Sequence, residues 1–223
     1  MTAPLAIDLC CGLGGWTEGL LAEGWRVRGY DIEVHEYGDA RYPAELVIRN
    51  VLEMHGSELA DADLIVASPP CQAYSYMAMP WKLAKAKAAA IRADETGEKL
   101  RDLNAIFNAC FRLQREASKV AGRYIPMVVE NVRGAQPWIG RAAWNFGSYY
   151  LWGDVPSLMP FFDGRRKGFA GFKGFKDFSD CEAARKWSSR DPRRKQWSAE
   201  IAKIPLALSS HIARVYKPKE LAA

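Results

Sequence analysis

The apolar residues of this chain fall into short continuous runs and into longer stretches with helical spacing. The runs at 4–9 and 63–67 are mostly aliphatic, and each ends in a turn signal, a pattern typical of buried parallel strands. Residues 98–120 instead place apolar side chains three and four positions apart, from Leu100 to Val120, which predicts an amphipathic helix. Strands that alternate with helices predict an α/β fold, a mostly parallel sheet flanked by helices.

The same pattern predicts the remaining elements. Strands are expected at 25–30, 45–49, 124–129 and 144–153, and helices at 16–23 and 199–216. Residues 77–96 are basic and alanine-rich, and two interpretations stay open: a mobile loop or loose helix over a site, and a plain surface helix. The returning helix at 199–216 divides the chain into a main domain at 1–162, an insertion at 163–198 and a C-terminal segment at 199–223.

Charge distinguishes the insertion from the rest of the chain. Residues 163–198 hold eleven Lys and Arg against five Asp and Glu, a net +6, which leaves 20 − 21 = −1 for the remainder of a chain of net charge +5. Phenylalanine recurs every third residue from Phe169 to Phe178, with interspersed glycines that no long helix tolerates. A basic, aromatic, glycine-rich loop suits nucleic-acid phosphates and bases, and a solvated surface loop is the alternative.

Composition argues against a membrane protein, a disulfide-rich protein and a metalloprotein. No apolar run approaches the roughly 18 residues of a membrane span, and residues 4–9 resemble a first strand more than a signal peptide. The five cysteines are an odd number, which argues against a disulfide framework and for a reducing compartment. His35, His55 and His211 show no metal-ligand spacing. We therefore expect a cytoplasmic protein without a bound metal.

Two polar segments follow predicted strands and are candidates for chemistry. Ser-Pro-Pro-Cys at 68–71 comes directly after the strand at 63–67, at the kind of position where open α/β sheets bind their ligands. The two prolines stiffen the turn, and the first side chain after them is a thiol. Glu130 follows the strand predicted at 124–129, and a carboxylate there is costly unless it is paired or functional.

A glycine-containing turn at 10–15 joins the first strand to the first helix, and Asp31 ends the second strand. This layout is typical of nucleotide-binding half-sheets. The dinucleotide fingerprint requires a third glycine where Thr17 stands, and Asp8 lies four residues ahead of the first glycine. Both features favour a cofactor without a pyrophosphate, such as S-adenosylmethionine, over a dinucleotide; a tight turn without a ligand is the alternative. Asn50 either reaches an adenine edge or caps the next short helix.

Three motifs together resemble the DNA cytosine-5 methyltransferases. They are Asp-Leu-Cys-Cys-Gly-Leu-Gly-Gly at 8–15, Pro-Cys-Gln at 70–72 and Glu-Asn-Val at 130–132, in the order and spacing of that family, and they cover residues 4–135. The resemblance implies a Rossmann-like fold that binds S-adenosylmethionine. It also implies that the main domain is catalytic and cofactor-binding, and that the insertion is a reduced target-recognition element.

The resemblance implies a chemistry and its residues. Cys71 adds as a thiolate to C6 of a flipped cytosine, which requires a lowered pKa, and Glu130 contacts N3 and the exocyclic amine. The implied contacts of S-adenosylmethionine are Asp8, Leu9, Cys10, Gly12, Gly14, Gly15, Trp16, Asp31 at the ribose, Ile32 at the adenine, Asn50, Val51 and Pro70. The expected contacts of double-stranded DNA are Gln72, Ser75, Arg133, Arg165, Arg166, Lys167, Arg193 and Arg194. We expect a monomer.

The chain departs from the family pattern at several points. Tyr-Tyr-Leu-Trp-Gly at 149–153 stands where a Gln-x-Arg-x-Arg motif is expected, so the arginine that braces the flipped base is unassigned, with Arg133 and Arg165 as candidates. Cys10 replaces a Phe that stacks on adenine, and Trp16 either compensates or is a core residue. The short insertion has room for few base contacts, which predicts a target of about two to four bases.

Three other interpretations compete with this one. Amino-methyltransferases share Ser-Pro-Pro but follow it with an aromatic residue, whereas this chain has Cys71. An RNA cytosine-5 methyltransferase would use the same residues on a different polymer. A non-catalytic DNA-binding homologue would explain the missing arginine motif, but it leaves Cys71 and Glu130 without a role.

Overall fold

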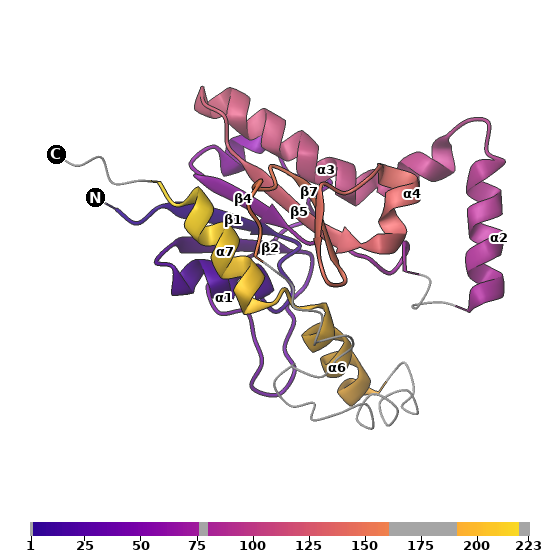
Figure 1. The fold of residues 1–223 in the computed structure, drawn as a ribbon, viewed down its shortest axis with the longest axis horizontal. Helices are drawn as coiled ribbons and strands as arrows, with labels where there is room; N and C mark the ends of the chain where they lie inside the picture. Colours follow the sequence, from indigo (N-terminus) through magenta and orange to yellow (C-terminus); the bar gives the residue numbers. More distant parts are fainter. Residues whose placement is uncertain (1, 76–79, 161–190, 219–223) are drawn as a thin grey trace.

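The computed structural model describes residues 2–75, 80–160 and 191–218 (Figure 1). The strands are β1 (Leu5–Leu9), β2 (Arg26–Asp31), β3 (Glu45–Ile48), β4 (Leu64–Ala67), β5 (Met127–Val132), β6 (Trp144–Phe146) and β7 (Tyr149–Gly153). The helices are α1 (Gly15–Ala22), α2 (Trp81–Arg92), α3 (Glu98–Ala121), α4 (Gln136–Ile139), α6 (Pro192–Ala202) and α7 (Leu206–Tyr216), with short 3-10 helices η1 (Gly56–Leu59) and η2 (Arg133–Ala135).

The strands form one seven-stranded sheet in the order β3-β2-β1-β4-β5-β7-β6. The five strands from β3 to β5 are parallel, and β7 runs antiparallel to both β5 and β6. The chain builds outward from β1 through β2 and β3 on one side, and through β4 and β5 on the other. The point of reversal, between β1 and β4, is where open α/β sheets bind ligands, outside the carboxyl ends of the strands.

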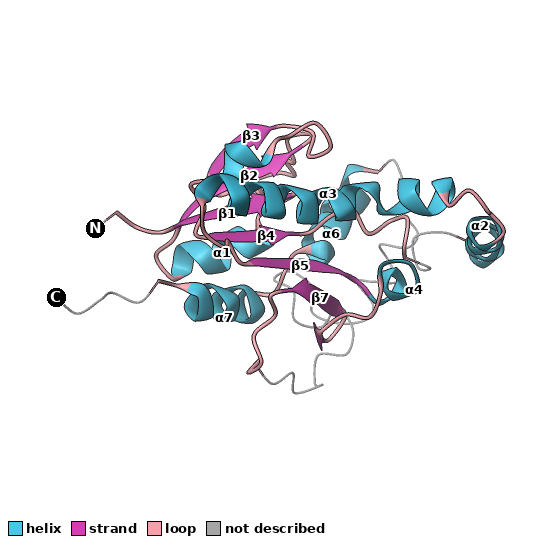
Figure 2. Ribbon diagram, turned by 90° about the horizontal axis from the view of Figure 1, so that it is seen from above, coloured by secondary structure: helices cyan, strands magenta, loops and turns pink. Residues whose placement is uncertain are grey.

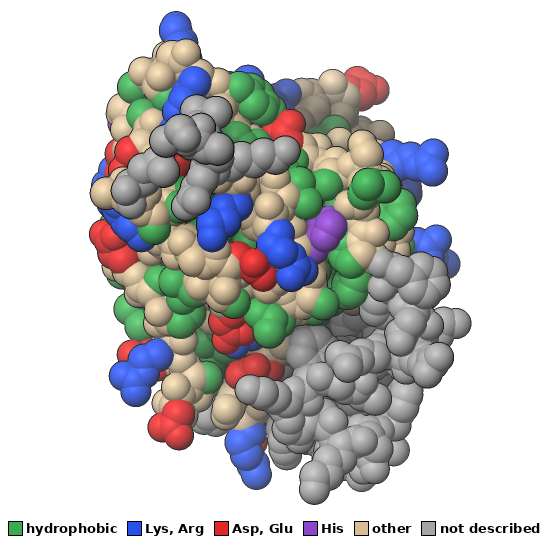
Figure 3. All heavy atoms as spheres, turned by 60° about the vertical axis from the view of Figure 1, so that its left-hand side comes forward, with side chains coloured by type: hydrophobic (Ala, Val, Ile, Leu, Met, Phe, Trp, Pro, Cys, Tyr) green, Lys and Arg blue, Asp and Glu red, His purple; other side chains and the backbone are tan. Residues whose placement is uncertain are grey.

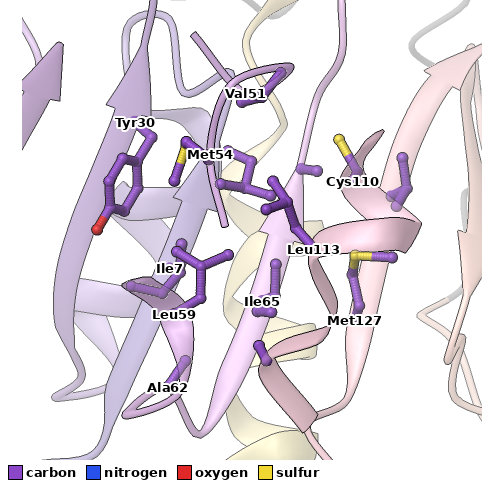
Figure 4. Packing of buried hydrophobic residues seen from close by; sticks show 14 of the residues in the cluster. Ile7, Tyr30, Val51, Met54, Leu59, Ala62, Ile65, Cys110, Leu113 and Met127 are labelled. Atoms are coloured by element: carbon purple, nitrogen blue, oxygen red, sulfur yellow. The ribbon is translucent and has the colours of Figure 1, made fainter. Parts of the chain in front are cut away.

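Helices cover both faces of the sheet, and each face has its own hydrophobic core (Figure 2). On one face, Ile7 of β1 and Ile65 of β4 pack with Leu113 of α3 (Figure 4). On the other face, Leu20 of α1 and Leu208 of α7 belong to the second cluster. The mostly parallel sheet flanked by helices that the sequence predicted is confirmed.

The strand predicted at 124–129 is shifted along the chain, since β5 extends from Met127 to Val132. Its start is delayed because Pro126 has no N–H for the ladder and the N–H of Ile125 donates to the Ser118 hydroxyl of α3. Glu130 therefore lies within the strand, paired opposite β7, and does not follow it.

Helix α2 shows that residues 81–92 are helical and not a loop, which agrees with either interpretation in its helical form. It projects from the body of the molecule beyond the start of α3 (Figures 1 and 2). Ala84 and Ala88 are its buried residues, whereas Trp81 is 61% exposed and carries Lys85 over its ring at 5.1 Å. The alanine-rich face makes the contact with the rest of the chain and leaves the lysines in solvent.

The single helix expected at 199–216 is in fact two helices. Helix α6 begins earlier, at Pro192, where the Asp191 side chain accepts the N–H of Arg193 as a cap. It ends before Pro205, which separates it from α7 because proline cannot continue the hydrogen-bond ladder. Most of 163–198 lies outside the described residues, so the proposed division into domains stays a prediction.

Basic and acidic side chains are interspersed on the face drawn in Figure 3, in line with the near-zero charge of the chain outside 163–198. No helix in the described ranges is long and apolar enough to cross a membrane. Within those same ranges, no group of three His, Cys, Asp or Glu side chains could hold a metal ion.

Candidate active site

The turn after β4 presents Cys71 at the carboxyl edge of the sheet, next to the point where the strand order reverses. The N–H of Ser68 still donates to the Leu9 carbonyl of β1 at 3.1 Å, so the turn leaves the sheet only after this residue. Pro69 is buried, and its carbonyl accepts the side-chain amide of Asn131 at 2.9 Å. The turn is therefore tied to strands on both of its sides.

Helix α3 anchors the far side of the same turn. The N–H groups of Tyr74 and Ser75 both donate to the Cys71 carbonyl, at 3.0 and 2.9 Å. The buried Tyr74 hydroxyl lies 3.0 Å from the carbonyl oxygen of Leu103 and 3.0 Å from the side-chain oxygen of Asn104. The backbone around the thiol is thus held between the sheet and α3, which pre-organises the thiol for chemistry.

Glu130 lies on β5, the neighbour of β4, and is only 9% exposed. Burial raises the pKa of its carboxyl group to about 8, although a hydrogen bond with Ser68 opposes this rise. The Ser68 hydroxyl also accepts the indole N–H of Trp16 at 3.0 Å. One hydroxyl group therefore links a buried indole to a carboxyl that is largely protonated at neutral pH and able to donate a proton.

The thiol of Cys71 interacts with this carboxyl group. Burial raises the pKa of Cys71 above its ordinary value, and the negative charge of ionised Glu130 raises it further. The sequence-based expectation of a lowered pKa is therefore wrong for the chain without a ligand, because both effects disfavour the thiolate.

Gly12 and Ile32 form an open surface at the carboxyl ends of β1 and β2, and the mostly buried Asp31 carboxylate is bonded to both. The Asp31 carboxylate accepts the N–H of Gly12 at 2.9 Å and the N–H of Ile32 at 2.8 Å, one on each oxygen. Gly12 has φ +51°, and a Cβ built there would meet nothing within 4 Å. Ile32 is 68% exposed, and Pro70 is exposed beside Cys71. An adenosine could be held here by apolar contact and by hydrogen bonds to the carboxylate.

The other two glycines of the turn serve the packing of the protein. A Cβ on Gly14 would lie 2.6 Å from a ring carbon of Pro43, and a Cβ on Gly15 would lie 2.3 Å from the backbone nitrogen of Ile204. Gly14 also has φ +78°, a conformation that favours glycine. Glycine is required at both positions because other parts of the protein pack directly against them. A contact with a cofactor is therefore not needed to explain why these two residues are glycine.

Several predicted cofactor contacts are core residues. Leu9, Trp16 and Val51 are 0%, 1% and 5% exposed, so their side chains cannot meet a ligand. For Trp16 this decides between the two alternatives in favour of a core residue, which supports Ser68.

Asp8 is also removed from the surface. It is fully buried, where Thr17 donates a hydrogen bond to it at 2.7 Å and the Tyr42 hydroxyl lies 2.7 Å from the Thr17 hydroxyl. Burial raises the pKa of Asp8 to about 8. Its second carboxylate oxygen has no partner within the described chain. The bonded oxygen ties β1 to α1 through Thr17.

Cys10 and Asn50 reach the surface but use their side chains elsewhere. Cys10 has φ +54°, and its thiol hydrogen-bonds Cys110 on α3, which turns it toward the core and away from a stacking position. The Asn50 side chain accepts the N–H of Leu52 at 3.1 Å and donates to Glu53 at 2.9 Å. Asn50 was expected either to reach an adenine edge or to cap the next short helix, and these two hydrogen bonds fit the capping role.

The predicted DNA contacts near the catalytic turn are accessible. Gln72 is exposed, and Ser75 lines a cleft of about 280 Å³ between the turn, α2 and α3. Arg133 is exposed and begins η2, directly after β5.

The predicted DNA contacts late in the chain are placed only in part. Arg193 is exposed on α6, where its guanidinium pairs with Asp191 at 2.8 Å, and Arg194 occupies the next position of the helix. The remaining predicted contacts, Arg165, Arg166 and Lys167, lie outside the described residues.

Sequence reasoning missed the supports of the site. Asn131 follows Glu130 on a strand, so its side chain points to the opposite face, where it holds the Pro69 carbonyl. Ser68 and Tyr74 hold the other parts of the turn. The sequence did contain one signal for Asn131, an amide side chain directly after the candidate acid at the end of an apolar run. A buried amide requires a hydrogen-bond partner.

Comparison with known proteins supports the family resemblance. The family model of the C-5 cytosine-specific DNA methylases matches residues 5–85. This segment runs from β1 into α2, so it includes the glycine turn and Cys71 and stops before Glu130. The match confirms the resemblance over that segment. No curated protein matches the chain.

Solved structures that resemble the chain include three methyltransferases. A candidate DNA modification methyltransferase from an E. coli prophage is 20% identical, with 60% of this chain and 33% of that chain covered and a TM-score of 0.39. The Entamoeba histolytica methyltransferase EhMeth is 16% identical, with 63% and 41% covered and a TM-score of 0.39. The S. pombe Dnmt2 methyltransferase is 12% identical, with 62% and 37% covered and a TM-score of 0.37. The matched part spans about a third to two-fifths of the length of these proteins.

Proposed function

We propose that this protein transfers a methyl group from S-adenosylmethionine to C5 of cytosine in double-stranded DNA. The observation that carries the proposal is that a thiol and a buried carboxyl group with a raised pKa lie close together on neighbouring strands, Cys71 directly after β4 and Glu130 within β5. The family match over residues 5–85 supports the class of reaction.

The residue types fit the chemistry. The Cys71 thiolate forms a bond to C6 of the cytosine, and the electron pair of the C5–C6 double bond moves to C5. Glu130 holds its proton at N3, where it stabilises the charge that the ring accepts. C5 would then form the bond to the methyl group of S-adenosylmethionine, whose bond to the sulfonium sulfur would break and leave its electron pair on that sulfur. A base then removes the C5 proton, the electron pair of the C5–H bond restores the double bond, and the C6–S bond breaks, which returns the thiolate.

The open surface beside β1 and β2 is suited to S-adenosylmethionine, which supplies an electrophilic methyl group when bound. Ile32 offers an exposed apolar side chain to the adenine. The Asp31 oxygen that accepts the Gly12 N–H retains a lone pair for a ribose hydroxyl group, whereas the other oxygen already contacts the Ile32 N–H and the His35 ring at 3.3 Å. Gly12 leaves the backbone open.

Double-stranded DNA is the proposed substrate, acted on by a monomer. The target cytosine must leave the stack to reach Cys71, which costs a few kcal/mol. The basic residues of α2 and the +6 charge of 163–198 would offset this cost through phosphate contacts. The limited length of 163–198 supports a short target of about two to four bases.

The proposal is tested with a duplex that contains 5-fluorocytosine, in the presence of S-adenosylmethionine. Fluorine cannot leave C5 as a proton does, so the C6–S bond should persist as an adduct that survives denaturation. We expect this adduct with the wild-type chain and none with Cys71→Ala, while a duplex with ordinary cytosine serves as the matched substrate control. No adduct on a library of duplex sequences would overturn the proposal, and an adduct on tRNA alone would favour the RNA alternative.

A further inference from the structure

A polar depression of about 530 Å³ lies beside the end of β5, among η2, α4 and β6. Figure 2 shows α4 close to the end of β5 and β7. The residues that line the depression are Arg133, Gln136, Arg141, Ala142, Ala143, Trp144, Asn145 and Tyr150. Tyr150 pairs with Asn131, the neighbour of Glu130, so the depression begins one strand away from the candidate active site.

The charge of this depression is one-sided. Its lining includes two arginines and no acid within the described chain. Neither guanidinium forms a hydrogen bond or an ion pair with any residue that the structure describes. By contrast, other arginines of the described chain pair with carboxylates: Arg28, Arg49, Arg112, Arg123, Arg193 and Arg214. Two unpaired guanidinium groups in one hollow favour an anion.

The segment that carries Arg141 is held on both sides. The carbonyl of Gly140 accepts the indole N–H of Trp152 at 3.0 Å, and the N–H of Ala142 donates to the Gln136 side chain at 3.2 Å. That bond uses the amide oxygen of Gln136, so its amide N–H groups are left to donate. The backbone around Arg141 is therefore fixed, and the lining offers further neutral donors.

The aromatic side chain in the lining distinguishes a nucleic acid from a free phosphate. Trp144 is 44% exposed on the edge strand β6. An exposed ring beside cationic groups is the combination that binds single-stranded nucleic acid, because a base stacks on the ring while the cations hold the backbone.

We propose that Arg133 and Arg141 bind a backbone phosphate of the nucleic-acid substrate in this depression, with Trp144 against a neighbouring unpaired base. The inference rests on the function proposed above. Residues 149–153 lack the arginines that the family pattern has there. In this proposal Arg133 and Arg141, which lie in the segment before β7, provide the cationic groups instead.

The test measures the salt dependence of duplex binding by fluorescence anisotropy between about 50 and 200 mM salt, the range over which phosphate contacts dominate affinity. We expect Arg133→Gln/Arg141→Gln to reduce the slope of log K against log salt by about 1, since the two arginines bind one phosphate and each lost phosphate contact contributes about 0.9. Affinity should fall equally for all sequences. Arg133→Lys/Arg141→Lys keeps both charges and should keep the slope.

Arg115→Gln is the matched control, because this exposed arginine of α3 also has no partner in the described chain. An unchanged slope in the double Gln variant, with the wild-type chain binding DNA normally, would overturn the inference and leave the Cys71 adduct, and so the proposed function, intact. Failure of the wild-type chain to bind any duplex would overturn both. Calorimetric binding of cytidine monophosphate that disappears in the double variant, with an unchanged duplex slope, would assign the depression to a free nucleotide and also overturn it.

Discussion

Replacing Ser68 with alanine removes one hydroxyl group that contacts two buried side chains. The hydroxyl accepts the indole N–H of Trp16 at 3.0 Å and hydrogen-bonds the carboxyl group of Glu130. Ser68→Ala therefore leaves the indole N–H without an acceptor and the carboxyl group without a bond that favours its ionised form. The two losses have separate and measurable consequences.

The first consequence concerns stability. A buried donor without an acceptor costs about 1–3 kcal/mol, and Trp16 is 1% exposed. For a chain of this size, about 1 kcal/mol lowers the melting temperature by about 2–4 °C. We therefore expect a loss of about 2 kcal/mol and a fall of about 4–8 °C in a thermal melt. Ser57→Ala, at an exposed position, is the matched control and should melt like the wild-type chain.

The second consequence concerns the pH dependence of methyl transfer. The bond from Ser68 lowers the pKa of Glu130, which burial has raised to about 8. Without that bond the carboxyl group holds its proton to higher pH. Because the proposed chemistry needs the protonated form of Glu130, the rate should decline at a higher pH in Ser68→Ala than in the wild-type chain.

A double-mutant cycle with Trp16→Phe separates the two effects. Phenylalanine keeps an aromatic ring but has no N–H, so Ser68→Ala should cost little stability in this background and should still shift the basic limb of the pH profile. The reasoning is refuted if Ser68→Ala melts at the same temperature as the wild-type chain and the basic limb of its pH–rate profile does not move.

Two further predictions concern packing and the thiol. Gly15→Ala places a Cβ 2.3 Å from the backbone nitrogen of Ile204, so overpacking should cost about 1–3 kcal/mol in a denaturant melt, and a wild-type melt for this variant would contradict the close approach. Gly12→Ala, whose Cβ meets nothing within 4 Å, should lose only the backbone cost of about 1–2 kcal/mol. Glu130→Gln removes a charge that raises the pKa of Cys71, so the pH profile of iodoacetamide alkylation should move to lower pH; an unchanged profile would mean that thiol and carboxyl do not interact.

The sequence predicted the elements whose signals are local. The strand before Cys71 and the helix at 98–120 were recovered because apolar spacing reports which side of an element is buried. The strand that holds Glu130 was displaced because Pro126 has no N–H for the ladder and the N–H of Ile125 bonds to Ser118 of α3, a tertiary contact that no window of sequence contains.

The glycine turn illustrates a different limit. The sequence identified three glycines and assigned all of them to a cofactor, yet Gly14 and Gly15 are required by Pro43 and Ile204. These partners lie far along the chain, so a motif could not distinguish a glycine that faces a ligand from one that faces the protein.

The sequence by itself determined the α/β class, the family resemblance, and Cys71 and Glu130 as candidates for chemistry, because these follow from periodicity, residue type and order along the chain. Only the tertiary structure decided that Trp16 supports Ser68, that the pKa of Cys71 is raised, and that Arg133 and Arg141 line one depression. Burial and contact between distant residues control these properties, and they exist only once the sheet brings the strands together.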